Sequence, residues 1–130
     1  MARILVVDDE ELARFTIREI LETAGHEITE AENGNEAIAS QNANPFDLII
    51  TDIIMPEKEG VETIIELKAD YPNLKIIAIS GGGRTKNLDF LKLADEFGAD
   101  KILAKPFSED ELMEYVDVCL RTRFQPEPTG

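Results

Sequence analysis

The sequence predicts a single α/β domain in which five parallel strands form a sheet with helices on both faces. Three observations support this fold class. Short apolar runs alternate with longer segments of helical periodicity, in the order (βα)₅. The runs are apolar nearly throughout, which is typical of parallel strands that are covered on both faces and joined by right-handed helical crossovers. The length of 130 residues suits one hydrophobic core and leaves no room for two domains.

The five expected strands are defined by their apolar content and by the turn residues that separate them. The strongest runs lie at 3–7 (RILVV), 46–50 (FDLII) and 74–79 (LKIIAI), and shorter ones lie near 26–31 and 101–104.

The first two helices have recognisable ends. Apolar positions from Ala13 to Ala24 share one helical face, and Gly25 is suited to end that helix. Asn33 is expected to cap the second helix, with Glu36 reaching back toward the helix start.

The remaining helices are placed by apolar spacing and by a second cap. A third helix is expected from 61 to 67, before Pro72, and a fourth from 88 to 97, before Gly98. Ser108 and Glu111 form a capping box at the start of the fifth. Its inward positions are Leu112, Val116, Cys119 and Leu120.

Composition narrows the possible functions. The net charge of −14 opposes binding to DNA phosphates or to anionic lipid, so neither direct nucleic-acid contact nor a membrane partner is expected. No apolar run approaches the roughly 18 residues of a membrane span, and the sequence shows no basic leader followed by a small-residue cleavage site. We therefore expect a cytoplasmic domain over residues 1–121. Residues 122–130 (TRFQPEPTG) are predicted to be a flexible tail or a linker stub.

Polar side chains that could bind a metal or take part in a reaction recur where the strands end. Asp8 and Asp9 follow the first strand, and Asp52, Ser80 and Lys105 follow the third, fourth and fifth. The carboxyl ends of parallel strands share one edge, and the order 2-1-3-4-5 would place the first strand beside the third. We therefore expect these five side chains to meet in one crevice.

Simpler explanations exist for each residue taken alone. Asp9 could cap the helix that follows, and Glu10 and Glu11 are best explained by the positive end of that helix. Asp52 and Ser80 could be turn residues. Lys105 could be an ordinary surface charge, but four separate coincidences would then be needed, and one shared site explains the residues better.

The residue types at this edge suit a hard cation and a phosphoryl group. Mg²⁺ prefers carboxylate, carbonyl and phosphate oxygens. An Asp52 carboxylate could attack phosphorus if the metal and the Lys105 ammonium offset the repulsion between anions, with Ser80 donating to a further oxygen. No histidine, cysteine or second hydroxyl in this set offers a competing nucleophile.

The sequence resembles the receiver domain of bacterial two-component response regulators of the chemotaxis type (CheY-like) over about residues 2–121. Five motifs in order carry the resemblance. They are ILVVDDE at 4–10, NGNEAI at 33–38, DLIITDIIMPEKEG at 47–60, IIAISG at 76–81 and GADKILAKPF at 98–107. The resemblance implies a flavodoxin-like sandwich with the strand order 2-1-3-4-5.

The resemblance also implies a role for each site residue. Asp52 would accept a phosphoryl group, and Asp9 and Asp52, with Asp8 partly through water, would hold Mg²⁺ together with the backbone carbonyl of Ile54. Lys105 would bind a phosphoryl oxygen, and its peptide bond to Pro106 is expected to be cis. Ser80 would be the hydroxyl that moves toward the phosphate.

Three positions depart from the family pattern. Ile102 occupies the place where most receivers carry an aromatic switch residue, three positions before the lysine. The usual coupling of Ser80 to an aromatic ring is therefore not expected at this switch position, and the output is instead expected to rest on movement of the loop after Ser80 and of the fourth helix. GGG at 81–83 and EKEG at 57–60 replace more usual sequences.

The expected function is a phosphoacceptor switch and not an enzyme in the ordinary sense, with self-phosphorylation and slow autodephosphorylation only. Its partners would be a sensor histidine kinase or phosphotransfer protein, and a downstream protein or output domain bound through the face of the fourth helix, fifth strand and fifth helix. A monomer is expected, with a dimer as the alternative. The alternative hypotheses are a Mg²⁺-dependent aspartyl phosphohydrolase, a flavin-binding module, and a degenerate receiver that serves only as an interaction module.

Overall fold

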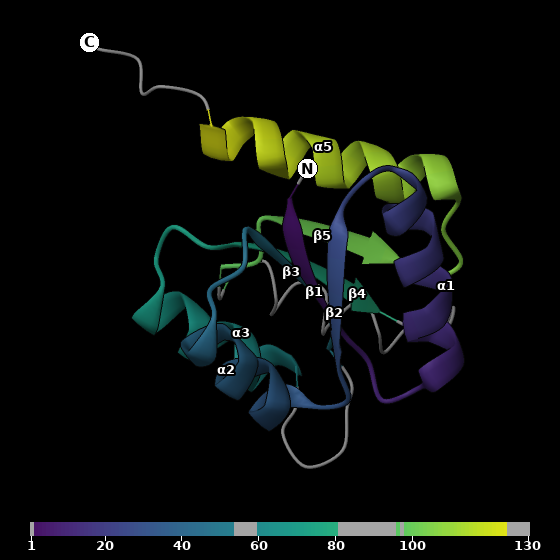
Figure 1. The fold of residues 1–130 in the computed structure, drawn as a ribbon. Coiled ribbons are helices and arrows are strands. Elements are labelled where there is room, and N and C mark those ends of the chain that lie inside the picture. Colours follow the sequence, from purple (N-terminus) through teal and green to yellow (C-terminus); the bar gives the residue numbers. More distant parts are fainter. Residues whose placement is uncertain (1, 54–59, 81–95, 97, 125–130) are drawn as a thin grey trace, which may run out of the picture.

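The structure is a computed structural model that describes residues 2–53, 60–80, 96 and 98–124 (Figure 1). The described strands and helices alternate along the chain. In order, they are β1 (Arg3–Val7), α1 (Glu11–Thr23), β2 (Glu27–Ala31), α2 (Gly34–Ala43), β3 (Leu48–Asp52), α3 (Gly60–Asp70), β4 (Lys75–Ser80), β5 (Lys101–Ala104) and α5 (Glu109–Phe124). The helix predicted at 88–97, the glycines at 81–83 and residue Ile54 lie outside the described residues, except for Glu96.

The five strands form one parallel sheet in the order β2-β1-β3-β4-β5. β1 lies at the switch point of this order because it pairs with β2 on one side and with β3 on the other. The predicted fold class and strand order are confirmed. The site is expected at this switch point because loops leave the neighbouring strands there in opposite directions.

Two hydrophobic layers cover the sheet, as Figure 1 shows with α1 and α5 on one face and α2 and α3 on the other. Alternate residues of β1 serve the two layers. Ile4 and Val6 pack with residues of α1 and α5, whereas Leu5 and Val7 pack with residues of α2 and α3. All four side chains are buried, which explains why this strand is apolar at consecutive positions.

The helix ends follow the predicted caps, with one difference. Gly25 has a φ of +96°, a backbone conformation that favours glycine. The Asn33 side chain accepts a hydrogen bond from the Glu36 N–H at 2.9 Å. Glu36 reaches back as expected, but its carboxylate accepts from the N–H of Glu32, one residue before the cap.

The fifth helix begins as predicted and continues further. The Ser108 N–H donates to the Glu111 carboxylate, and the Glu111 N–H donates to the Ser108 hydroxyl oxygen, both at 3.1 Å. α5 then runs to Phe124, so it continues through the first three residues of the segment predicted to be a tail.

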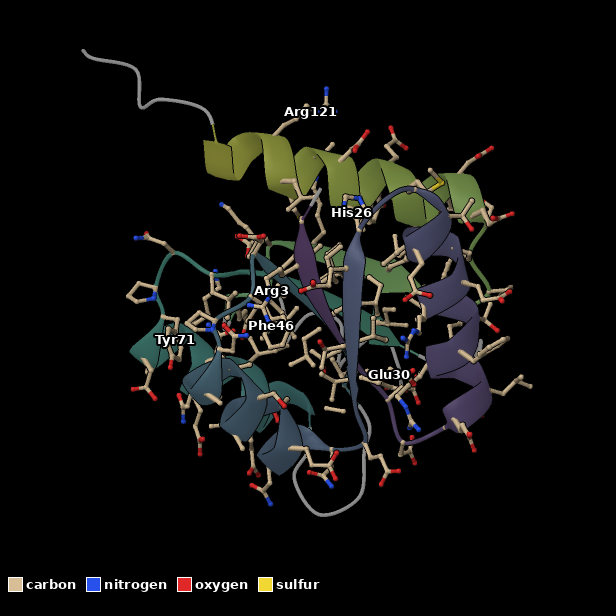
Figure 2. All side chains as sticks on the ribbon, in the orientation of Figure 1. Arg3, His26, Glu30, Phe46, Tyr71 and Arg121 are labelled. Carbon is tan, nitrogen blue, oxygen red and sulfur yellow. The ribbon has the colours of Figure 1, made fainter. Side chains whose placement is uncertain are left out.

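The third strand lies two residues later than predicted. Just ahead of β3, the Asp47 carboxylate accepts the Arg3 N–H at 2.9 Å and the Asp47 N–H donates to the Arg3 carbonyl at 2.8 Å. Arg3 also places its guanidinium 4.7 Å from the ring centre of Phe46 (Figure 2). Asp52 and Ser80 are the last residues of β3 and β4 and do not follow these strands.

Candidate functional site

Lys105 joins two buried carboxylates at the carboxyl edge of the sheet. Its Nζ lies 3.4 Å from Oδ2 of Asp8 and 3.8 Å from Oδ2 of Asp52. Asp8 is 2% exposed and Asp52 is 6% exposed. These groups come from the ends of β1, β3 and β5, so the predicted convergence of Asp8, Asp52 and Lys105 at one edge is observed.

A second group of acidic side chains lies at the start of the turn between β1 and α1. Carboxylate oxygens of Asp8, Asp9 and Glu10 lie within 4.8 Å of one another. Asp9 and Glu10 are exposed, whereas Asp8 is buried. The Glu10 N–H donates to Oδ1 of Asp8 at 2.9 Å, which fixes the Asp8 carboxylate on its own turn.

The explanation of Glu10 as a residue that only favours the helix start is therefore incomplete. Glu10 is the N-cap residue of α1 but makes no side-chain cap hydrogen bond, and its carboxylate instead joins the acidic group. Asp9 is not the cap. Glu11 lies in the first turn of α1, where a negative charge is favourable. The four consecutive acidic residues after a buried strand, Asp8 to Glu11, were the available signal that Glu10 joins this group.

The acidic group is chemically suited to Mg²⁺. Its donors are carboxylate oxygens, which hard divalent cations prefer. The buried Asp8 carboxylate limits hydration on one side, while Asp9 and Glu10 are open to solvent on the other. Such a site leaves room for the waters that Mg²⁺ keeps.

The other predicted site residues are placed less completely. The Lys105–Pro106 peptide bond is cis, as predicted. Ser80 pairs with Ala104 in the β4–β5 ladder, which puts its backbone at the same edge, but its side chain lies outside the described residues. Ile54 also lies outside them. Ile102 is partly buried against the core layer of α2 and α3, away from the α5 side of the sheet.

Arg14 is a site neighbour that the sequence interpretation missed. Its Nη1 donates to the backbone carbonyl of Asp8 at 2.6 Å, and its Nε donates to the Glu30 carboxylate at 3.0 Å. Figure 2 shows Glu30 at the end of β2 facing α1. A basic residue in a helix that follows three acids was the only sequence signal, and periodicity alone could not show which partner it reaches.

An apolar groove of about 660 Å³ adjoins the site between α1 and the segment that leads into α5. Glu10 and Lys105 line both the groove and the site. Leu12 of α1 lines the groove and is 75% exposed. The other groove residues include Ala13, Thr16, Ile20, Pro106 and Phe107.

The remaining candidate groups lie away from the site. His26 precedes β2 and its Nδ1 accepts the Ala2 N–H at 3.2 Å, which agrees with the predicted packing role. Burial lowers the pKa of His26. Cys119 is buried in the layer formed with α1 and α5, as expected, and burial raises the pKa of its thiol to about 11.

A parallel sheet of this order, with buried carboxylates joined by a lysine at its switch point, defines a flavodoxin-like α/β domain with an acidic site for a cation or a phosphoryl group. Comparison with known proteins identifies the family. Residues 4–117 match the response regulator receiver domain, so the chain belongs to that family of two-component signalling proteins.

Several relatives resemble the chain over most of its length. The chemotaxis protein CheY of Halobacterium salinarum is 35% identical over 114 residues, which are 88% of this chain and 92% of that protein. The receiver domain of NtrX from Brucella abortus is 33% identical with a TM-score of 0.86, and the match covers 92% of this chain and 98% of that domain.

Other relatives are longer. The transcriptional regulatory protein ResD of Bacillus subtilis is 35% identical to the chain, which covers 50% of it. The chain covers 27% of a longer NtrX structure, with a TM-score of 0.87. The same domain thus occurs alone or as part of a larger regulator. Within the described part of this chain, no helix is both long and apolar enough to cross a membrane.

Proposed function

We propose that the chain is a phosphoacceptor switch in which Asp52 takes a phosphoryl group from a phosphohistidine of a sensor kinase or phosphotransfer protein. The observation that carries this proposal is the Lys105 ammonium, which lies within 4 Å of both Asp8 and Asp52. A cation held beside a buried carboxylate at the switch point can offset the charge of an incoming phosphoryl group.

The transfer balances without a further reactant. One Asp52 carboxylate oxygen bonds to phosphorus while the bond from phosphorus to the donor imidazole nitrogen breaks, and the electron pair of that bond leaves with the nitrogen. The product is an acyl phosphate. Slow attack by water on phosphorus returns the Asp52 carboxylate and inorganic phosphate, which limits the lifetime of the signal.

The chain's own residues would divide the work of holding the phosphoryl group. Lys105 would bind one of its oxygens, and Ser80 would donate to another. Asp8, Asp9 and Asp52, with the Ile54 carbonyl, would hold Mg²⁺, and Glu10 adds a carboxylate beside Asp8 and Asp9. When bound, Mg²⁺ would neutralise phosphoryl charge.

The output is proposed to pass through a face formed by the helix predicted at 88–97 together with β5 and α5. Phosphorylation adds close to two negative charges at an edge that is already acidic, so groups able to donate hydrogen bonds would move toward it. Ser80 and Ala104 are ladder partners, which links the end of β4 to β5. Lys101 of β5 lies over the Tyr115 ring of α5, with Nζ 5.7 Å from its centre. Ile102 would shift with β5 through its packing.

We place docking of the phosphodonor protein on the apolar groove beside α1. The groove is continuous with the site because Glu10 and Lys105 line both. Its apolar floor and the acidic residues Glu10 and Glu109 suit an amphipathic helix with basic flanking residues. Such a helix could present a phosphohistidine directly to the edge that carries Asp52.

Labelling with acetyl phosphate and Mg²⁺, followed by intact-mass measurement, tests the acceptor. Wild-type chain should gain one phosphoryl group and Asp52→Asn none, while the far-ultraviolet circular dichroism of both stays the same. Undiminished labelling of Asp52→Asn would remove Asp52 from its role. Sustained turnover of p-nitrophenyl phosphate would favour the phosphohydrolase, and absence of any labelling in the wild type would favour a degenerate receiver.

A second assay tests the docking surface. A purified histidine phosphotransfer protein that labels the wild-type chain serves as the donor. Leu12→Ser should slow transfer from this protein at least fivefold more than it slows labelling by acetyl phosphate, because only the protein donor uses the groove. An exposed apolar residue on α3, Ile65, provides the matched control as Ile65→Ser, since it is 42% exposed and belongs to another layer. Equal effects of the two variants would remove the groove from the docking surface.

A further inference from the structure

We infer that Arg14 is a positioning residue that holds the β1–α1 turn in the shape in which Asp8, Asp9 and Glu10 converge. This inference deepens the proposed function and rests on it, because it concerns how the proposed Mg²⁺ ligands are oriented. Arg14 touches none of the reacting atoms. Its guanidinium donates to the Asp8 backbone carbonyl and is also anchored on Glu30.

The guanidinium of Arg14 bridges two neighbouring strands. Nη1 donates to the Asp8 carbonyl at the end of β1, and Nε donates to Glu30 in β2. Nη2 lies 3.9 Å from Glu32, just beyond β2. The planar fork can reach a carbonyl and a carboxylate at once, which the single ammonium nitrogen of a lysine cannot do in the same geometry.

The arginine is buried, so its contacts are well placed to hold the turn. Arg14 is 8% exposed although it lies only three residues into α1, and its neighbours Leu12 and Phe15 are exposed. A buried guanidinium must keep its hydrogen-bond partners, because an unpaired buried charge is costly. The Asp8 carbonyl is one of these partners, so its orientation is constrained.

Three further hydrogen bonds complete the constraint on the turn. The Asp8 N–H donates to the Ala31 carbonyl at 3.2 Å, and the Arg14 N–H donates to the Glu10 carbonyl at 3.1 Å. The Glu10 N–H donates to the Asp8 carboxylate. Fixing the Asp8 carbonyl therefore also fixes the peptide that carries Asp9 and the bond that orients the Asp8 carboxylate.

Glu30 is held in place by a second arginine. Arg18 donates to the other Glu30 oxygen at 2.8 Å, and to Glu22 at 3.0 Å. The hydrogen bond from Arg18 is the main cause that lowers the pKa of Glu30, and Arg14 lowers it further. Glu30 is thus held more strongly in its charged form, which is the form that bonds to Arg14. Arg18 makes no contact with Asp8 among the hydrogen bonds of the described residues, which makes it a matched control.

A purely structural role is the competing explanation, in which Arg14 only joins α1 to β2. Arg18→Gln separates the two explanations because it removes bonds to the same Glu30 and leaves the Asp8 carbonyl contact. If Mg²⁺ affinity depends only on the connection between α1 and β2, it should weaken in both Arg14→Gln and Arg18→Gln. If it depends on the shape of the Asp8 turn, it should weaken in the Arg14 variants alone.

Two readouts on the full chain test the inference. Isothermal titration with MgCl₂ should show affinity weakened about tenfold in Arg14→Gln, the lower end of the effect known for residues that orient metal ligands. Arg18→Gln should stay within twofold of the wild type. Without Mg²⁺, hydrogen exchange of the Glu10 amide should be at least fivefold faster in Arg14→Gln than in Arg18→Gln. Arg14→Lys keeps the charge and should show the same two changes, and it replaces Arg14→Gln if that variant fails to fold.

The outcomes separate the inference from the proposed function. Unchanged Mg²⁺ affinity and unchanged Glu10 exchange in both Arg14 variants would overturn the positioning role, as would equal losses in Arg18→Gln. If the wild type itself binds no Mg²⁺, the proposed function fails, and Glu10 exchange still decides whether Arg14 holds the turn. At saturating Mg²⁺, labelling of Arg14→Gln by acetyl phosphate should return to at least half the wild-type rate.

Discussion

Removing the Lys105 ammonium should destabilise the chain when no Mg²⁺ is present. In Lys105→Met the stem is kept, but two buried carboxylates lose a cation that lies 3.4 Å and 3.8 Å from them. Coulomb attraction at an effective dielectric of about 20 is roughly 4 kcal/mol for each such pair. Lys105 is 24% exposed, so water screens part of this attraction. Removing one partner of a buried pair costs about 3–5 kcal/mol, and we expect about 3 kcal/mol here.

The assay is denaturant unfolding followed by circular dichroism, with and without Mg²⁺. A loss of about 3 kcal/mol corresponds to a fall in Tm of roughly 10 °C for a domain of this size. Mg²⁺ should reduce the loss, because a bound cation would replace part of the missing positive charge. The double variant Asp8→Asn/Lys105→Met should lose about 1–3 kcal/mol less than the sum of the two single losses, since it removes both members of one pair.

Lys101→Met is the matched control for this prediction. Lys101 is the first residue of β5, the strand that Lys105 follows, but its ammonium contacts the Tyr115 ring, and such a contact is worth about 0.5–1 kcal/mol at an exposed site. Two results would contradict this prediction. In one, Lys105→Met loses no more stability than Lys101→Met, and in the other, the two changes in the double variant are simply additive. Either result would mean that Lys105 does not stabilise the two carboxylates and that the electrostatic basis of the site is wrong.

Three further predictions concern groups outside the site. Burial raises the pKa of Cys119 to about 11 from an ordinary value of 9.0. Its thiol should therefore resist iodoacetamide at pH 8 until the chain unfolds, and rapid alkylation of the folded chain would contradict this. The free energy of unfolding should also fall as pH rises from about 9 to 11. Burial lowers the pKa of His26, so the unfolded chain binds a proton first, and stability should fall as pH drops below about 6.5. His26→Gln should lose that slope in urea titrations, and an identical slope would exclude His26 as its source. Gly98→Ala should cost about 1–3 kcal/mol, because φ is +113° and the added Cβ would lie 3.1 Å from Cγ of Lys68. Gly25→Ala should cost less, because its φ is +96° and nothing lies within 4 Å of the added Cβ; the reverse order in thermal unfolding would refute the steric argument.

Much of the fold follows from short-range patterns. The apolar run of β1 predicted a strand covered on both faces, and Ile4 and Leu5 do pack into opposite layers. Asn33 and Ser108 were expected to start helices, and both accept the predicted cap hydrogen bonds. These features could be predicted because each depends on residues within a few positions along the chain.

The meeting of Asp8, Asp52 and Lys105 could be predicted for a different reason. A parallel sheet brings the carboxyl ends of its strands to one edge, so residues far apart in sequence share that edge once strand character is known. The exact last residue of a strand is less predictable. β3 runs from Leu48 to Asp52, and just before it Asp47 pairs with Arg3 through its carboxylate and through its N–H, a pairing between distant residues that apolar spacing does not reveal.

The sequence by itself determined the alternation of strands and helices, the helix caps and the edge on which the acidic residues and Lys105 lie. Only the tertiary structure decided that Glu10 joins Asp8 and Asp9, and that Arg14 reaches across to the Asp8 carbonyl and to Glu30. The physical reason is that periodicity tells which face of a helix is buried, whereas the partner of a long polar side chain depends on how that helix packs against strands from other parts of the chain.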